Sequence, residues 1–418
     1  MKPFVPLEEP LEVALATFPS VSPHVRERLA RLKGTGITVW PRDSAALREG
    51  VSPLAIGFIT VAYDSMRLDY LAQSVNSVAE QNDERKSLVI IDNGTTGAVL
   101  EFVDALRAAG TVDVVVRVPE NRFDPRMHDK NPLIDLWNLG AILAPTRFFF
   151  PLSWDDWISS NYVSEMLHLL GQNDCIAAAP LAVPVLADGT VNQAYADRIR
   201  LGNTQSRMTP GRDVLKARIG LSDARVFTAP GDLLCVDTAT LVRNGGYDDM
   251  SDVSLFIKVG IYGNIGYSPA ARLFWRNHNL QANRVQKGQG LVYFRTYATF
   301  PSRYGLEALL SDAGAPDLAR AIPGAFREMA ESVTRRSVQG SFKRGLVPGL
   351  RAALGVVSQA RPSVAMRILR DARTQDLIRR ETRKSLQRLK ADPRGIVPQA
   401  ARRIIGRVMR RIARLLSR

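Results

Sequence analysis

Acidic residues follow several apolar stretches of this sequence, at places where a buried strand would end. Asp64 follows the stretch 56–61, Asp92 follows 88–91, and Asp155 with Asp156 follow 147–152. Carboxylate oxygens are the ligands that Mg²⁺ and Mn²⁺ prefer. A metal ion held in this way can neutralise the charge of a bound diphosphate. The acidic residues therefore indicate phosphate-linked chemistry that depends on a divalent metal, either Mn²⁺ or Mg²⁺.

The elements around these residues predict an α/β fold with a mostly parallel sheet. Short apolar runs at 56–61, 88–91, 112–118 and 147–152 are typical of strands, and helical spacing of apolar residues separates them, as at 68–81 and 136–143. Alternating strands and helices favour parallel βαβ units covered on both faces. Such sheets bind ligands at the carboxyl ends of their strands. We therefore expect 62–64, 92–94 and 153–156 on one edge.

The ordered motifs resemble those of inverting glycosyltransferases of family two, which have the GT-A fold. The matching segments span roughly residues 54–285. They are 61–64, 77–81, 91–97, 138–142, 152–157, 245–249, 251–252 and 275–278. The resemblance implies a Rossmann-like, mostly parallel sheet flanked by helices, and a helical region follows it along the chain.

The resemblance also implies roles for individual residues. It implies transfer of a sugar, with inversion, from a nucleotide diphosphate donor to a hydroxyl of a glycan or lipid-linked acceptor. Such a reaction belongs to the biosynthesis of cell-surface polysaccharides. Asp252 would be the general base, and Asp155, Asp156 and His278 would hold the metal. The donor would contact Ala62, Tyr63, Asp64, Asp92, Asn138, Trp154 and Asp155.

Each of these residues also has a purely structural interpretation. Asp92 lies in an Asp-Asn-Gly sequence that suits a turn, and Tyr63 could pack beneath that turn. Asp156 could cap a helix that begins at Ile158, and Asp252 could cap another helix. His278 could be a structural histidine in a polar run.

Two serines depart from the family pattern. Ser153 replaces the first acidic residue of the metal motif, and Ser251 replaces the glutamate beside the expected base. A catalytically inactive scaffold that binds nucleotide sugars is therefore an alternative hypothesis. In a further alternative, the chain is a membrane-surface docking protein whose α/β domain is incidental.

The positive charge of the chain is concentrated in its last part. The net charge is +15, and residues 335–418 contain 23 Lys or Arg against four acidic residues, a net of +19. The rest of the chain is therefore slightly acidic, which argues against a nucleic-acid groove there. Basic residues between apolar ones at 402–418 predict an amphipathic helix on an anionic membrane. Packing on this protein or a partner is the alternative. Nucleic acid is less favoured, because no aromatic residue follows Phe342.

The remaining features suggest the domain organisation and compartment. We expect an N-terminal extension at 1–50, a GT-A domain at 51–300 and a helical region with the basic tail at 301–418. Cys175 and Cys235 form no metal-binding or disulfide pattern, and the simplest interpretation is two small buried side chains. No secretory signal or membrane-spanning stretch is evident. A cytoplasmic protein, peripheral on the inner face of the cytoplasmic membrane, is expected.

Overall fold

The structure is a computed structural model that divides into two compact units, Met1–Gln286 and Lys287–Arg418. It describes residues 6–18, 20–43, 52–122, 132–172, 174–200, 205–222, 234–247, 255, 259–278, 297–299, 301–302, 305–343, 345–359 and 362–390.

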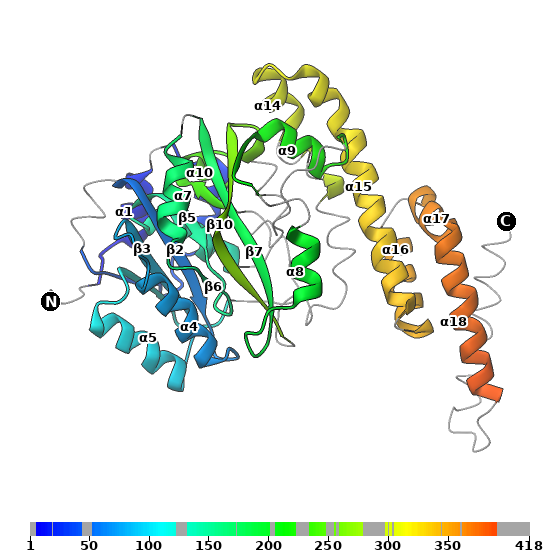
Figure 1. Cartoon of the computed structure of the whole chain (residues 1–418), viewed down its shortest axis with the longest axis horizontal. Coiled ribbons are helices and arrows are strands. Elements are labelled where there is room, and N and C mark those ends of the chain that lie inside the picture. The colour runs from blue at the N-terminus through cyan, green and yellow to red at the C-terminus, as the bar shows by residue number, and fades with distance from the viewer. Residues whose placement is uncertain are drawn as a thin grey trace. The chain divides into compact units, whose positions relative to one another are not determined.

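One ten-stranded sheet runs through the described part of the first unit (Figure 1). Its strand order is β1-β4-β3-β2-β5-β9-β7-β10-β6, with β8 paired to β10. One set of strands points in a single direction: β2 (Ser52–Ala62), β3 (Lys86–Asn93), β4 (Val114–Val118), β5 (Thr146–Pro151), β7 (Cys175–Leu186) and β10 (Asn264–Asn277). The shorter strands run the opposite way: β1 (Thr38–Pro41), β6 (Trp157–Ile158), β8 (Arg207–Pro210) and β9 (Cys235–Asp237). The predicted mostly parallel sheet is confirmed.

Helices cover both faces of this sheet. Helices α4 (Leu68–Ala79), α5 (Gly97–Ala109) and α6 (Leu133–Leu143) connect the parallel strands at the places where the sequence predicted helices. Alternate residues of β2 show the two faces. The ring of Phe58 meets Tyr162 of α7 (Tyr162–Leu170), whereas Ile59 lies against Gly140 of α6. A strand buried on both faces explains why the sequence of β2 is continuously apolar.

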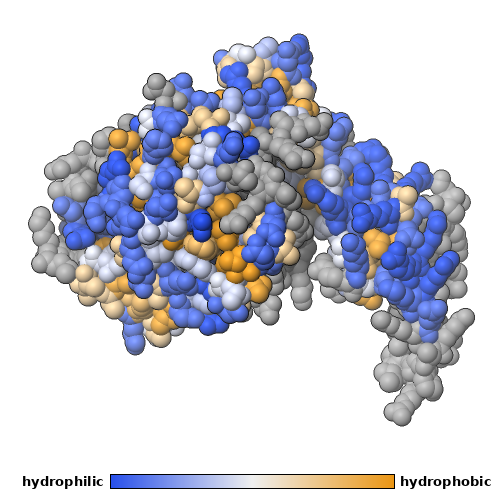
Figure 2. Space-filling model, viewed as in Figure 1, coloured by the Kyte–Doolittle hydropathy of each residue, from blue (hydrophilic) through white to orange (hydrophobic). Residues whose placement is uncertain are grey.

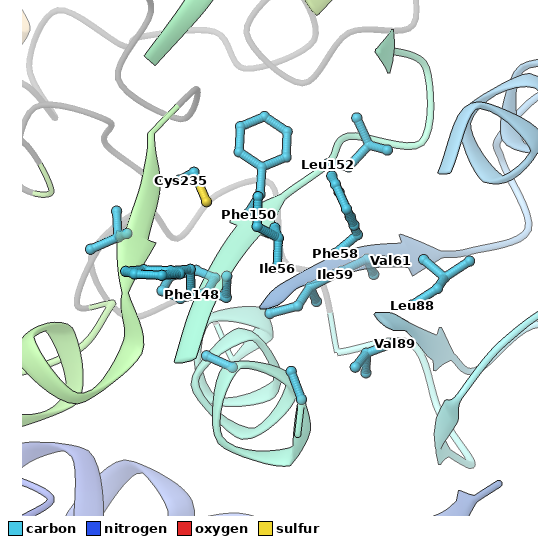
Figure 3. Close-up of a cluster of buried hydrophobic side chains, with 14 of the residues drawn as sticks. Ile56, Phe58, Ile59, Val61, Leu88, Val89, Phe148, Phe150, Leu152 and Cys235 are labelled. Atoms are coloured by element: carbon cyan, nitrogen blue, oxygen red, sulfur yellow. The ribbon is translucent and has the colours of Figure 1, made fainter. Parts of the chain in front are cut away.

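Aromatic side chains of β2 and β5 lie in the buried core (Figure 3), where they also contact Tyr162 of α7. The rings of Phe58 and Phe150 lie 6.0 Å apart, and Tyr162 lies 5.1 Å from Phe150. All three are fully buried. Burial of one such side chain contributes roughly 1.5–3 kcal/mol, so this cluster fixes β2 and β5 next to each other. Cys175 and Cys235 are also buried and form no disulfide, as expected.

Two segments differ from the sequence-based expectation. Residues 157–158 form strand β6, paired with Leu273 and Phe274 of β10, and the next helix begins only at Tyr162. The interpretation of Asp156 as the cap of a helix from Ile158 is therefore wrong. Cross-strand pairing to β10 decides this conformation, and local sequence cannot reveal it. The second segment is 187–227, whose polar sequence is typical of loops, but its described residues include α8 (Gln193–Arg200), β8 and α9 (Gly211–Arg218).

The described N-terminal residues belong to the first unit. Helix α1 (Pro10–Thr17) and helix α2 (Pro23–Ala30) precede β1, which extends the sheet by antiparallel pairing with β4. Ser22 caps α2, because its hydroxyl accepts a hydrogen bond of 3.3 Å from the backbone N–H of Val25. Such a cap satisfies a helix donor that would otherwise lack a partner.

Described residues of the second unit form helices, as predicted for the region after residue 301. They are α14 (Leu306–Asp312), α15 (Pro316–Lys343), α16 (Leu346–Gln359), α17 (Pro362–Arg370) and α18 (Ala372–Lys390). Phe342 of α15 packs closely on Gly349 of α16. On the face shown in Figure 2, these helices present mainly hydrophilic residues. Among the helices described, none is long and apolar enough to cross a membrane. The basic tail at 395–418 lies outside the described residues.

The contact between β2 and the start of β5 predicts a large cost for one added methyl group. A Cβ on Gly57 would lie 2.6 Å from both Ala144 Cβ and Thr146 Oγ1. Gly57→Ala should therefore lower the free energy of unfolding by about 1–3 kcal/mol, because the core cannot expand. Tryptophan fluorescence during urea denaturation measures this, since all five tryptophans lie in the first unit.

Gly324→Ala is the matched control. Gly324 lies in α15, where a Cβ would meet nothing within 4 Å. Alanine is also the better helix former. Because Gly324 lies in the second unit, which contains no tryptophan, the unfolding transition reported by tryptophan fluorescence should not move. An unchanged midpoint for Gly57→Ala would contradict the tight packing of β2 on β5.

Candidate active site

The strands that run in the common direction bring their carboxyl ends to one edge of the sheet. Tyr63 follows β2, Thr95 follows β3, Asp155 follows β5 and His278 follows β10. Hydrogen bonds and ring contacts join these segments along the edge. The sequence placed 62–64, 92–94 and 153–156 on one edge, and the strand directions agree with that arrangement.

Asp155 and His278 form the centre of this edge. Asp155 Oδ2 lies 2.7 Å from His278 Nε2, and both side chains are buried. A carboxylate oxygen and an imidazole nitrogen are both metal ligands, and here they meet from segments 123 residues apart in sequence. Hydrogen bonding to a carboxylate also orients the imidazole ring. The arrangement can hold a cation or transfer a proton.

Arg276 fixes the segment that carries Asp155. Its guanidinium donates from Nε to the backbone oxygen of Asp155 (3.0 Å), from a terminal nitrogen to the oxygen of Ala187 (3.0 Å), and from the other to Gln73 Oε1. The guanidinium carbon lies 3.9 Å from the ring centre of Tyr70, and Trp157 also contacts it. A buried guanidinium needs such partners, so Arg276 joins three segments that are distant in sequence.

Asp156 is engaged differently from its neighbour. Its Oδ1 accepts a hydrogen bond of 2.8 Å from the backbone N–H of Arg276, and the residue is buried. This contact closes the link between the end of β5 and the end of β10. Asp155, Asp156 and His278 thus lie together where β5 and β10 end, with Asp155 in hydrogen-bonding contact with His278 and Asp156 bound to the backbone of Arg276.

Aromatic rings surround the imidazole. The rings of Trp154 and Tyr70 each lie 5.5 Å from His278 in edge-to-face arrangements. Tyr63 makes a similar contact with Trp154, at 5.9 Å. Burial, with a smaller contribution from the charge of Asp155, raises the pKa of Tyr63 to about 12. Tyr63 therefore stays neutral over the ordinary pH range. Trp154 is buried and packs edge-to-face against the imidazole of His278.

A second group of contacts orders the loops after β2 and β3. Asp64 accepts hydrogen bonds from the backbone N–H (2.6 Å) and hydroxyl (2.9 Å) of Thr96 at the start of α5. Asp92 is fully buried: one oxygen accepts from the N–H and hydroxyl of Thr95, and the other pairs with Arg117. The structural interpretation of Asp92 as a turn residue is thus realised. Ala62 is also buried and pairs in register with Asp92.

Asn138 lies away from the Asp155–His278 contact and has other partners. Its amide donates hydrogen bonds to the backbone oxygens of Ile134 (2.9 Å) and Tyr247 (2.8 Å), and its oxygen accepts from the Tyr247 N–H (2.8 Å). Both amide hydrogens are used, and the residue is fully buried. The geometry corrects the expectation of a donor-contacting side chain, because Asn138 holds a backbone segment instead.

Asp252, the expected general base, lies outside the described residues, as do its neighbours Asp248, Asp249 and Ser251. The described chain ends just before them at Tyr247, whose ring packs against Trp137 and Phe149.

The residues present fit a divalent metal only in part. In the described part of the chain, no group of three His, Cys, Asp or Glu residues is placed to hold a metal ion. Asp155 and His278 supply two donor atoms side by side. Magnesium-type sites commonly use one or two protein carboxylates and take their other ligands from substrate phosphates and water. The pair therefore suits a metal that arrives with a diphosphate.

Sequence reasoning missed Arg276, Gln73 and Tyr70. Arg276 was part of a matched motif but was given no role. The signal that could have found it is an arginine directly after Leu273-Phe274-Trp275 in a buried strand, since such a charge requires partners. Gln73 and Tyr70 gave no signal, because their importance comes from contact with Arg276 across 203 and 206 positions.

Comparisons with known proteins identify similar sequences. Residues 58–200 match the sequence profile described as Glycosyl transferase family 2. The chain is also 18% identical over 233 residues to a protein of Haemophilus influenzae named as an uncharacterized glycosyltransferase, covering 55% of this chain and 68% of that relative.

Solved structures share the fold. TarS of Staphylococcus aureus, residues 1–349, superposes with a TM-score of 0.52 at 14% identity, covering 80% of this chain and 91% of that one. The same protein in complex with UDP-GlcNAc gives a TM-score of 0.53 at 15% identity, covering 80% and 92%. The chain therefore shares its fold with TarS, and its residues 58–200 are similar in sequence to glycosyl transferase family 2.

Proposed function

We propose that the chain transfers a sugar from a nucleotide diphosphate donor to a hydroxyl group, with inversion at the anomeric carbon. The contact between Asp155 and His278 carries this proposal. It places a hard oxygen donor and a nitrogen donor at the carboxyl edge of a doubly covered parallel sheet, the edge where such folds bind nucleotides.

The donor would bind along the edge from the end of β2 to the end of β10. Tyr63 and the backbone around Ala62 lie next to the loop that Asp64 and Asp92 order. In this proposal the two aspartates act mainly by holding that loop in a shape that accepts the nucleotide. The structure of TarS with UDP-GlcNAc supports a nucleotide sugar as the donor class.

Asp155 and His278 would hold Mn²⁺ or Mg²⁺ against the diphosphate. The metal would neutralise charge on the departing nucleotide diphosphate. Asp156 would support this pair by keeping the end of β5 bound to the backbone of Arg276. Trp154 would keep the imidazole in its plane through edge-to-face contact.

Asp252 is proposed as the general base, on the family resemblance of the 245–252 sequence. It would take the proton of the acceptor hydroxyl while the oxygen attacks the anomeric carbon from the face opposite the leaving group. The acceptor is proposed to be a glycan or lipid-linked saccharide of a cell surface.

Membrane docking is proposed for the basic tail. The net charge of +19 in residues 335–418, with apolar residues at helical spacing in 402–418, supports binding to an anionic membrane surface. A lipid-linked acceptor would be reached more readily by an enzyme held at that surface.

Replacement of Asp155 tests the proposed reaction. Wild type should hydrolyse at least one compound in a panel of nucleotide sugars, with water replacing the acceptor, as measured by release of nucleoside diphosphate. Asp155→Asn should lower that rate by about 100-fold or more, because a ligand of the metal is lost. Glu84→Gln is the control, since Glu84 is exposed at the opposite edge of the sheet. Full activity in Asp155→Asn would contradict the proposed site.

Metal removal gives an independent measurement. Treatment with EDTA should abolish donor hydrolysis, and added Mn²⁺ or Mg²⁺ should restore it. His278→Ala should raise the metal concentration needed for half-maximal activity by about 10- to 100-fold, because one of two protein donors is gone. Activity that persists after chelation would show that Asp155 and His278 act without a metal.

Deletion of residues 395–418 tests the docking proposal. The truncated protein should lose binding to vesicles that contain anionic phosphatidylglycerol and should keep the wild-type rate of donor hydrolysis. Co-sedimentation measures the first and nucleotide release the second. Binding of wild type should also weaken at high salt, because charge attraction is screened. Equal vesicle binding by both proteins would contradict a role for the tail.

A further inference from the structure

The guanidinium of Arg276 is held in place by the aromatic rings and the acceptors around it. Its carbon lies 3.9 Å from the ring centre of Tyr70 and 4.6 Å from that of Trp157. Trp157 in turn stacks on Phe274, with ring centres 5.0 Å apart and an angle of 9° between the ring planes. A guanidinium is planar, and its donors point in fixed directions. The surrounding rings and acceptors therefore determine its orientation as well as its position.

One acceptor of this guanidinium differs from two others. The two are the backbone carbonyls of Asp155 and Ala187, whereas the third acceptor is the side-chain oxygen of Gln73 on α4. Arg276 is buried, but Gln73 is exposed on the surface of its helix. The fold tolerates replacement of an exposed side chain well. Gln73 is therefore the partner of Arg276 that a substitution removes without opening the core.

Arg276 is connected to both members of the Asp155–His278 pair. Its Nε donates to the carbonyl of Asp155, and the carboxylate of the same residue lies 2.7 Å from His278. His278 follows Arg276 by two residues along the chain. The ring of Tyr70, which contacts the guanidinium, also lies 5.5 Å from the imidazole. A shift of the guanidinium therefore changes how the carboxylate and the imidazole face each other.

We propose that Gln73 is a positioning residue of the active site, which orients Arg276 and thereby sets the spacing of the Asp155–His278 pair. It acts through Arg276 and contacts neither the metal nor the donor. This role rests on the proposed function, in which the pair holds a divalent metal against a diphosphate. Gln73 lies between the matched motifs at 61–64 and 77–81 and belongs to neither. The surface of α4 thus joins the residues on which the reaction depends.

Replacement of Gln73 in the full-length chain tests this role by metal affinity. Removal of an outer partner of metal ligands commonly weakens metal binding by about 10- to 100-fold. Gln73→Ala should therefore raise the Kd of Mn²⁺ by about 10-fold, while the melting temperature changes little because Gln73 is exposed. Titration calorimetry measures this Kd in the presence of a nucleoside diphosphate, the one released from the nucleotide sugar that wild type hydrolyses fastest.

Gln73→Glu separates the acceptor from the rest of the side chain. A glutamate at this position keeps an oxygen that accepts from Arg276, and a hydrogen bond between two charged groups is a strong one. Gln73→Glu should therefore bind Mn²⁺ with nearly the affinity of wild type, in contrast to Gln73→Ala.

Hydrogen exchange gives a measurement that needs no metal. The backbone N–H of Arg276 donates to Asp156 at 2.8 Å, and this amide belongs to the residue that Gln73 orients. In metal-free protein, exchange at peptides that contain residue 276 should be faster in Gln73→Ala than in wild type. Gln73→Glu should exchange at the wild-type rate.

Asn76→Ala is the matched control. Asn76 is also an exposed amide on α4, three residues after Gln73, and alanine is the better helix former at both positions. The Kd of Mn²⁺ and the exchange at residue 276 should both match wild type in this variant.

The outcomes separate the role of Gln73 from the proposed function. An unchanged Kd of Mn²⁺ in Gln73→Ala, with a low hydrolysis rate in Asp155→Asn, would overturn the positioning role and leave the proposed function intact. Equal losses in Gln73→Ala and Gln73→Glu would also overturn it, because a restored acceptor would then have no effect. A wild type that hydrolyses no nucleotide sugar, or that binds no Mn²⁺, would overturn the proposed metal-dependent reaction and the positioning role with it.

Discussion

The burial of Arg276 is the constraint on which the arrangement at the carboxyl edge of the sheet depends. The residue is 3% exposed, so its guanidinium cannot rely on water and must find protein partners. It finds them on three segments that are distant in sequence, through Asp155, Ala187 and Gln73. The backbone N–H of Arg276 also donates a hydrogen bond to a side-chain oxygen of Asp156. The hydrogen bonds of this one guanidinium require the ends of β5, β7 and β10 to lie together, and this arrangement places His278 beside Asp155.

The acidic residues at this edge differ in their hydrogen-bond partners. The oxygens of Asp64 and Asp92 accept hydrogen bonds from loop N–H and hydroxyl groups or from Arg117. One oxygen of Asp156 accepts a hydrogen bond from the backbone of Arg276. Asp155 instead faces an imidazole. The four aspartates thus differ in their hydrogen-bond partners, and the tertiary structure decides which partners each one has. Rings of Trp154 and Tyr70 then restrict the imidazole.

The N-terminal helices show how close packing constrains a backbone segment that is distant in sequence. Val25 contributes only methyl groups, yet its position limits the residue opposite it to glycine. The ion pair of Arg28 with Asp135 ties this helix to α6, which also carries Asn138. Close packing transmits the position of α2 to the backbone at Tyr247, because a dense interior leaves little room for adjustment.

The sequence by itself determined the α/β fold and the sheet edge at which we propose the reaction. Continuous apolar runs such as 56–61 that alternate with helical patterns are typical of parallel strands covered on both faces, and the polar residues after such strands share an edge. Periodicity also located α4 and α6. Only the tertiary structure decided what each polar residue does there. Asn138 was expected at the donor and instead clamps Tyr247, 109 positions away, and Asp156 precedes a strand rather than a helix. The physical reason is that hydrogen-bond partners of buried polar groups come from distant segments, so local sequence carries the need for a partner but not its identity.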